Sequence, residues 1–433
     1  MRIFRTYFIW LIIPAAMLAL ALFFAPLDTG DEIPDESPVD LAYLKSDKKL
    51  NRTVKNWIGD LNAYKTEEYM DIPGLPVEMF IKEDEWEALQ NKSNRRSFKK
   101  NRYDFAIRLN NKSSYLGTYK LRGAGSLKRA YKAGTPDRLC YNIKLFKSIR
   151  FEPDVKLKKF YLMNMIFDPY YFKMRFSYKL LQSVGLFPSY HQFISLKING
   201  KPQGINLLVE RPQDSIVRTR SGVMGVYRRR NPENGHQVFE TKYQKPQQNE
   251  KWHMDRLYEV MKTLRGNELI SETNKIMDLD AYLTWLAFNS LMMCSDTSDE
   301  IYYSIVKSNE FPEGRIEFSA WDYDDIMDPN QPDYVIKDPL LFGCEDEIDK
   351  RVKSEPALYD LYKNILKNLL TMKMTEAYLI KVLKNVEQEG DQLSTGLPIE
   401  DERRLKIKRK EKIKTFESKL LARHSDLLKK LIK

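Results

Sequence analysis

The carboxylates with the most suggestive spacing lie in two acidic stretches in the second half of the chain. Asp296 opens the run Asp-Thr-Ser-Asp-Glu that ends at Glu300, and Asp322 and Asp324 belong to the sequence Trp-Asp-Tyr-Asp at residues 321–324. Carboxylate oxygens are hard ligands suited to Mg²⁺ that is also bound to phosphate groups. The two stretches therefore predict a magnesium–phosphate site if they converge, and the alternative is a pair of acidic surface loops.

A β-hairpin is the element that would bring the two acidic stretches together. Residues 301–306 (Ile-Tyr-Tyr-Ser-Ile-Val) form one predicted strand, and a second strand after a Glu-Gly turn leads into Trp321. In a hairpin the start of the first strand lies near the end of the second. Asp296 is therefore expected close to Asp322.

Glycine-bearing and basic motifs precede the acidic stretches. Residues 121–126 read Leu-Arg-Gly-Ala-Gly-Ser, and Lys144 lies in the apolar strand predicted over residues 141–146. A lysine ammonium is a compact charge suited to phosphate, and the alternative for Lys144 is an exposed position on a strand face. The order of glycine turn, strand lysine, helix, hairpin and two aspartate stretches parallels that of a protein kinase.

The remaining predicted elements place strands before helices. The sequence predicts further strands over residues 105–109 and 114–119, a hairpin that joins 193–198 to 205–210 through Asn-Gly, and helices over 168–184, 251–265, 278–293, 357–372, 375–389 and 401–432. Strands followed by helices indicate an α+β fold.

Taken together, these motifs resemble those of the CotH (spore coat protein H) kinase family. The resemblance includes residues 159–164 (Lys-Phe-Tyr-Leu-Met-Asn), residues 168–170 (Asp-Pro-Tyr) and the hairpin that ends at Glu210, and it covers about residues 75–390. It implies an atypical protein-kinase-like fold with a strand-rich N-terminal lobe and a helical C-terminal lobe. It also implies transfer of phosphate from ATP to Ser or Thr of a protein substrate.

The resemblance implies roles for the charged residues. Carried over by position, Lys144 contacts the α- and β-phosphates, and Asp296 orients the substrate hydroxyl. Asp322 binds Mg²⁺ (or Mn²⁺), with Asp324 and Glu300 as further metal ligands.

The nucleotide-binding roles fall on two backbone segments. Gly123, Gly125 and Ser126 lie in the turn whose N–H groups cover the phosphates. Glu210 lies in residues 208–211, the segment whose backbone forms the adenine hinge.

Two departures from the family pattern leave other functions open. The family has an Asn shortly after the catalytic Asp, whereas residues 297–301 here read Thr-Ser-Asp-Glu-Ile. The predicted helix over residues 168–184 also has no Glu to pair with Lys144. One alternative is a catalytically impaired kinase-like module for binding or assembly. A second is a metal-dependent glycosyltransferase, because a single anchor and an Asp-x-Asp motif occur together.

The N-terminus carries a membrane signal. Arg2 and Arg5 precede an uncharged, mostly apolar run over residues 6–27, which is long enough to span a bilayer as a helix. Because basic residues precede the run and acidic residues follow it, a single-pass anchor with the body outside the cytoplasm is expected. The alternative is a signal peptide cleaved near Ala-Leu-Ala at residues 19–21, which would give a secreted protein.

These observations predict four regions: a signal anchor or signal peptide (1–27), a linker and lead-in (28–74), a CotH kinase-like domain (75–390) and a basic helical tail (391–433). Residues 401–433 hold thirteen Lys or Arg and five Asp or Glu, a pattern that suits either an acidic partner or a solvated helix face. No nucleic-acid partner is expected. Three cysteines without a CxxC pair and only four histidines disfavour zinc or thiol chemistry.

Overall fold

The structure is a computed structural model, and it describes residues 74–110, 113–123, 128, 130, 139–233, 236–245, 250–294, 301–327, 338–342, 347–393 and 399–432. The predicted N-terminal anchor therefore lies outside the described residues. So do the site residues Asp296, Glu300, Gly125 and Ser126. None of the helices in the described ranges has the length and apolar character needed to cross a membrane.

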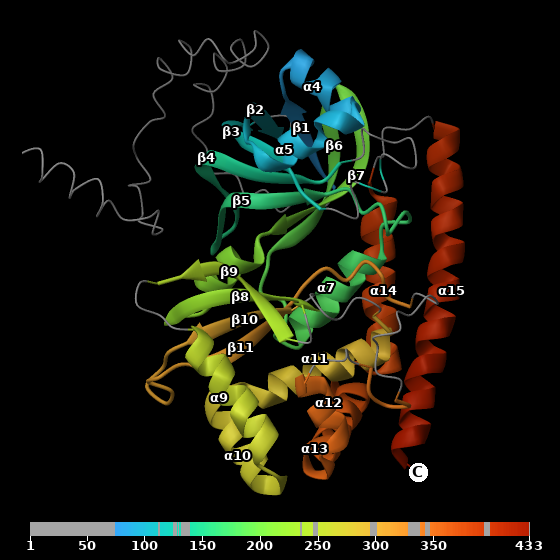
Figure 1. The fold of residues 1–433 in the computed structure, drawn as a ribbon. Coiled ribbons are helices and arrows are strands. Elements are labelled where there is room, and N and C mark those ends of the chain that lie inside the picture. The colour runs from blue at the N-terminus through green and yellow to red at the C-terminus, as the bar shows by residue number, and fades with distance from the viewer. Residues whose placement is uncertain are drawn as a thin grey trace, which may run out of the picture. The chain divides into compact units, whose positions relative to one another are not determined.

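A closed barrel of seven strands forms the first part of the described chain (Figure 1). Its strands are β1 (Leu75–Phe80), β2 (Tyr103–Leu109), β3 (Ser113–Leu121), β4 (Tyr141–Glu152), β5 (Val155–Met163), β6 (His191–Ile198) and β7 (Lys201–Glu210). They follow the order β1-β2-β3-β4-β5-β7-β6, and the parallel pairing of β1 with β6 closes the barrel. The short helices α4 (Glu83–Gln90) and α5 (Arg95–Lys100), with the 3₁₀ turn η2 (Lys92–Asn94), lie between β1 and β2.

Alternating side chains explain how these strands form the barrel. Along β4, Tyr141, Ile143 and Leu145 belong to the barrel core, whereas Asn142 and Lys144 point to its outer face. Because its side chains alternate, β4 has one apolar face in the barrel core and one more polar outer face. The outer face of β4 and β5 borders the candidate site, because Tyr161 on β5 contacts Trp321.

A four-stranded antiparallel sheet with the order β11-β10-β8-β9 follows the barrel. Its strands are β8 (Val223–Glu233), β9 (His236–Gln244), β10 (Ile301–Val306) and β11 (Arg315–Ala320), and helix α8 (Pro212–Thr219) connects β7 to β8. β10 and β11 pair in antiparallel register, with Ile301 opposite Ala320, so the predicted hairpin is confirmed.

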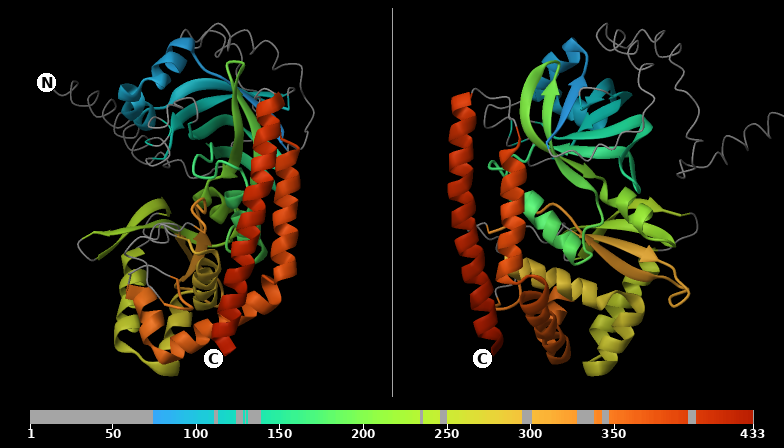
Figure 2. Two further views of the ribbon diagram at one scale, coloured as in Figure 1. Left: turned by 90° about the vertical axis from the view of Figure 1, so that its right-hand side faces the viewer. Right: turned by 180° about the vertical axis from the view of Figure 1, so that it is seen from behind.

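Helices make up most of the remaining chain. They are α7 (Lys173–Ser183), α9 (Glu250–Thr263), α10 (Gly266–Ile276), α11 (Leu279–Met292), α12 (Glu347–Ser354), α13 (Pro356–Asn368), a π-helical turn η3 (Leu369–Lys373), α14 (Glu376–Asp391) and α15 (Ile399–Ile432). Asp278 and Thr375 cap α11 and α14 by accepting hydrogen bonds from Ala281 N and Tyr378 N. Figure 2 shows α14 and α15 running side by side.

The long helix α15 packs one apolar stripe against the rest of the chain. Phe416 lies between Phe172 and Phe176 at the start of α7, with ring centroids 5.3 and 5.6 Å away. Leu420 and Leu427 continue the buried stripe. Within the predicted basic tail, residues 399–432 therefore form the expected helix, and this helix is packed on its apolar side.

Most predicted elements are confirmed, with two corrections. The predicted strands and the Asn-Gly hairpin are present, and both Asn199 and Gly200 have positive φ, as this hairpin turn requires. The expected order of strands first and helices later is only partly right, because β8 to β11 form a second sheet among the helices. The three consecutive arginines at residues 228–230 favour a solvated loop when the sequence is considered alone, and this expectation is wrong. These arginines lie in β8, and Arg229 is fully buried and donates to the Tyr282 hydroxyl (3.3 Å).

Candidate active site

Trp321 joins the end of the second sheet to the barrel wall. Its buried ring lies 5.8 Å from the ring of Tyr161 on β5 and 6.1 Å from that of Tyr178 on α7. The sequence favours a core packing role for this tryptophan, and these contacts confirm it. Because Asp322 follows directly, packing of Trp321 fixes this carboxylate next to β5.

Asp322 has an unusual backbone conformation. Its φ of +63° lies in the left-handed region, which side chains other than glycine rarely adopt and which Asp and Asn tolerate best. Residues held in such conformations often occur where the backbone must aim a functional side chain. The outlier therefore supports a functional role for Asp322, and it also means that only a few residue types fit there.

Side-chain contacts hold the turn that follows Asp322. The Tyr323 hydroxyl donates to Asn289 Oδ1 on α11 (2.7 Å), and Lys173 Nζ at the start of α7 donates to the carbonyl of Ile326 (2.8 Å). Met327 N–H donates to the carbonyl of Met292 (2.9 Å). The turn that carries Asp322 and Asp324 is thus fixed to two helices.

Arg122 connects the glycine turn to this aspartate. Its guanidinium lies 4.0 Å from the centroid of the Tyr161 ring and 5.5 Å from that of Trp321. Burial on its own lowers the pKa of Arg122, but Tyr161 and the Asp322 carboxylate act in the opposite direction and the pKa is raised. The start of the glycine turn and the predicted metal turn are therefore neighbours.

Lys144 lies on the same outer face of the barrel. It pairs across the sheet with Thr118 on β3 and with Lys159 on β5, and Asn142, two residues earlier, pairs with Tyr161. Directly paired residues in an antiparallel sheet point to the same side. Lys144 and Lys159 therefore share the face on which Tyr161 contacts Trp321.

Three further cations lie around Tyr161. Arg102 donates to Asn142 Oδ1 (2.9 Å), and the pKa of Lys120 is lowered by burial and by the neighbouring Arg102 and Arg211. Arg211, directly after β7, forms two hydrogen bonds to Asp214 (2.6 and 2.9 Å). We name this set of side chains the cationic face: Arg102, Lys120, Lys144, Lys159 and Arg211. Such a concentration of positive charge is suited to phosphate groups.

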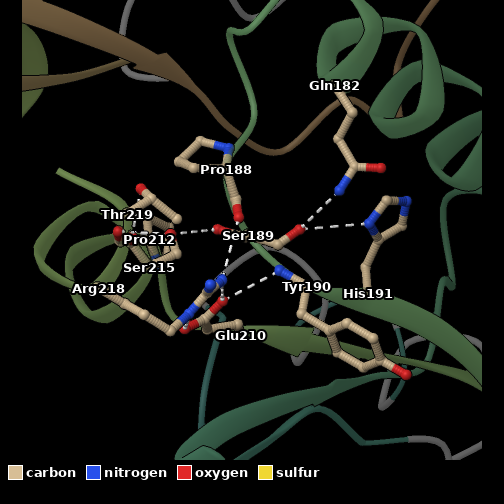
Figure 3. Close-up of polar contacts among 10 residues, drawn as sticks. All are labelled: Gln182, Pro188, Ser189, Tyr190, His191, Glu210, Pro212, Ser215, Arg218 and Thr219. Carbon is tan, nitrogen blue, oxygen red and sulfur yellow. Dashed lines mark hydrogen bonds and ion pairs between the residues drawn. The ribbon is translucent and has the colours of Figure 1, made fainter. Parts of the chain in front are cut away.

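Gly123 and Glu210, two of the predicted nucleotide-binding residues, have different surroundings. Gly123 follows Arg122 with a φ of +75°, a conformation suited to the turn predicted there. The buried Glu210 carboxylate accepts hydrogen bonds from Arg218 Nε (2.9 Å) and Nη2 (2.7 Å) and from Tyr190 N–H (3.1 Å), as Figure 3 shows. The N–H of Glu210 donates to the carbonyl of Tyr190 (2.8 Å). A nucleotide role for Glu210 therefore depends on its backbone carbonyl.

Helix α7 makes its ion pairs away from the strand lysines. Arg175 and Lys179 both bind Glu389 of α14, at 2.9 and 2.8 Å. Partial burial acts to raise the pKa of Glu389, but Arg175 and Lys179 outweigh it and the pKa is lowered. An arginine within this predicted helix is expected to form a structural ion pair, and the contact with Glu389 confirms it. The helix that carries a lysine-binding Glu in protein kinases is here tied to the C-terminal helices instead.

Sequence reasoning missed two parts of this site. The first is β5, with its inward residues Val155, Leu157, Phe160 and Leu162. The alternation of buried residues changes phase between Leu157 and Phe160, which hid the strand signal. The second is the side chain of Arg122, because the prediction for residues 121–126 depended on the glycines and the serine of this turn. The Lys-Phe-Tyr of residues 159–161 was noted only as a family motif.

Among the residues placed in the structure, no group of three acidic, cysteine or histidine side chains is arranged to hold a metal. Asp322 and Asp324 are described, and their predicted partner Glu300 is not. Mg²⁺ in nucleotide sites is typically held by one or two carboxylates together with phosphates and water. Two hard carboxylates on one fixed turn therefore fit a magnesium ion that a nucleotide brings with it.

The barrel, the second sheet and the supporting helices together define a protein of mixed α and β structure. A family model described as CotH kinase protein matches residues 120–396. The match covers more than half of the chain, so the chain belongs to the CotH kinase family, and the resemblance found in the sequence is confirmed. A search of curated proteins gave no match.

Proposed function

We propose that this protein transfers the γ-phosphate of Mg²⁺–ATP (or Mn²⁺–ATP) to Ser or Thr hydroxyls of a protein substrate. The main supporting observation is the contact of Arg122 and Tyr161 with Trp321, which brings the start of the glycine turn next to Asp322. This arrangement occurs in a member of the CotH kinase family. The closed barrel and antiparallel sheet give no support to the glycosyltransferase alternative, which requires a nucleotide-sugar α/β fold.

The chain's own residues would mainly position the reactants and neutralise charge. Phosphoryl transfer requires little covalent chemistry from the protein, so positioning and electrostatic stabilisation lower the barrier. Asp322 and Asp324 would hold the magnesium ion, which shields phosphate charge when it is bound. Lys144 on the cationic face would attract the α- and β-phosphates, and Asp296 would orient the substrate hydroxyl and accept its proton late.

The second candidate is a kinase-like module that binds nucleotide without transferring phosphate. The observation in its favour is the sequence Thr-Ser-Asp-Glu-Ile at residues 297–301, where the family has an Asn as a second metal ligand. The absence of a Glu in α7 for the strand lysines agrees with it. Nucleotide binding without transfer would decide for this candidate.

A phosphotransfer assay with γ-labelled ATP and the full-length chain tests the proposal. Asp322→Asn is the preferred variant because Asn tolerates the left-handed backbone at this position and removes the charge. We expect transfer to fall by about 100-fold or more in Asp322→Asn and to fall in Lys144→Ala as well. Lys147→Ala, an exposed lysine on the same strand, is the matched control and should retain activity. Wild-type protein that binds ATP but transfers no phosphate would refute the kinase proposal.

We also propose that residues 6–27 anchor the protein in a membrane with the body on the outer side. The charge pattern of the N-terminus supports this orientation. Protease added to intact cells should then digest the body. Protection of the body from protease would reverse the orientation and would place the kinase on the side where ATP is abundant.

A further inference from the structure

Arg122 is a cation that the fold does not neutralise. Its Nη1 atom is buried and has no hydrogen-bond partner within the described part of the chain. In that same part, no carboxylate comes close enough to form an ion pair with it, since Asp322 interacts with it only at longer range. The residue as a whole is only partly buried, so solvent still reaches one side of it.

Two other partly buried arginines in this region, Arg218 and Arg211, differ from Arg122 in having acidic partners. Arg218 is paired with Glu210 at 2.7 Å, and Arg211 with Asp214 at 2.6 Å. Burial of a charge is costly unless the charge is paired and hydrogen-bonded. The fold meets this requirement at two arginines and leaves it unmet at Arg122.

The surroundings of Arg122 hold its guanidinium in place without using its charge. The Tyr161 ring lies 4.0 Å from it, and the Trp321 ring lies 5.5 Å away. Contact with aromatic faces fixes the plane of a guanidinium and leaves its N–H edges for an anion. Asp322, the predicted metal ligand, follows Trp321 directly, so an anion bound by Arg122 would lie beside the metal site.

We propose that the Arg122 guanidinium binds the phosphate chain of the nucleotide next to Asp322, as the main phosphate-binding side chain of this site. The proposal rests on the proposed function, and it moves the principal phosphate contact from Lys144 to the arginine of the glycine turn. Lys144 and Lys159 lie two residue pairs further along the barrel wall than Asn142 and Tyr161. Lys144 and Lys159 would then attract the phosphate groups at longer range.

Binding and stability of the full-length chain test this inference without relying on turnover. The probes are Mg²⁺–ATP, Mg²⁺–tripolyphosphate and adenosine, measured by isothermal titration calorimetry. Arg122→Met keeps the length of the side chain and removes the charge, and Arg122→Lys keeps the charge and removes the planar fork. Arg256→Met is the matched control, because Arg256 also lies over an aromatic ring, that of Trp252 at 5.4 Å, on helix α9.

We expect Arg122→Met to weaken ATP and tripolyphosphate binding at least about tenfold, as for loss of a charge-assisted contact, while adenosine binding stays unchanged. Arg122→Lys should give an intermediate loss. The melting temperature of ligand-free Arg122→Met should equal or exceed that of wild type, because an unpaired buried charge has been removed. A purely structural arginine would instead give a lower melting temperature and a loss of adenosine binding as well.

Each outcome has a distinct meaning. If wild type and Arg122→Met bind tripolyphosphate equally, Arg122 is not the phosphate contact and the proposed function stands. If ligand-free Arg122→Met melts below wild type, the charge is satisfied in the fold and the inference is overturned. If wild type binds neither ATP nor tripolyphosphate, the proposed function fails together with the inference.

Discussion

Removing Arg218 should destabilise the fold more than removing the charge of its partner Glu210. The side chain of Glu210 is 2% exposed and that of Arg218 is 23% exposed. In Arg218→Met the carboxylate stays buried with the N–H of Tyr190 as its remaining hydrogen bond. In Glu210→Gln the guanidinium keeps its charge, but it can turn toward water.

The sizes of the two effects follow from these surroundings. Breaking a buried ion pair by removing one partner costs about 3–5 kcal/mol, and we expect Arg218→Met to lie in this range. Glu210→Gln loses the charge but keeps an acceptor, so its cost should be nearer about 1.5–3 kcal/mol, the value for a hydrogen bond to a charged group. Hydrogen bonds with Glu210 also raise the pKa of Arg218, so this guanidinium remains charged at neutral pH.

Urea unfolding followed by tryptophan fluorescence, at neutral pH and without nucleotide, measures both costs. The double variant should cost less than the sum of the single variants by about 1–3 kcal/mol, because the two side chains interact directly. Lys363→Met removes one partner of an exposed pair with Asp360 (2.7 Å) and serves as the control, with an expected cost below about 1 kcal/mol. Additive single costs, or a larger cost for Glu210→Gln than for Arg218→Met, would refute this account of the pair.

Three further predictions concern the barrel and the helices. Burial raises the pKa of Asp168 to about 6. The contribution of this carboxyl group to stability is therefore largest at low pH and is lost as the pH rises through this value. Melting curves from pH 4 to 7 should show this decline in wild type and not in Asp168→Asn. Gly117→Ala would place a methyl group against the carbonyl of Lys144. It should therefore destabilise the protein by about 1–3 kcal/mol and weaken ATP binding. Unchanged urea and ATP titrations would show that β3 and β4 can separate to admit the methyl group. Tyr282→Phe removes a hydroxyl that donates to buried Asp349 (2.6 Å), and its cost by urea unfolding should be about 1.5–3 kcal/mol; a cost below about 0.5 kcal/mol would mean that other partners of Asp349 suffice.

The elements with strong local signals were predictable. The hairpin of β6 and β7 has an Asn-Gly turn, and the long helices α13 to α15 have a clear apolar period. Local patterns are enough here because each signal lies within a few residues of the element it specifies. The strand β5 was missed because the alternation of its buried residues changes phase between Leu157 and Phe160.

The site was predictable only in part. The Trp-Asp-Tyr-Asp motif and the glycine turn identified Asp322 and Gly123, and Trp321 was correctly expected to be a packing residue. The contribution of Arg122 could not be read from its neighbours in sequence. Its surroundings come from β5 and β11, about forty and two hundred residues further along the chain.

Glu210 is a second residue whose partners the sequence did not predict. Its place at the end of a strand suggested an exposed carboxylate or a nucleotide contact, yet Arg218 and Tyr190 surround it. The partners of a charged group depend on which segments pack together, and composition does not reveal them.

The sequence by itself determined the CotH kinase family, most of the secondary structure and the identity of the acidic and glycine motifs. Each of these depends on residue order and short-range periodicity. Tertiary structure alone decided that the strands close into a barrel, that five cations share its outer face, and that Arg122 stays unpaired beside Asp322 while Arg218 does not. These features depend on distances between segments far apart in the chain, because charge pairing acts over a few ångströms in space, whatever the separation in sequence.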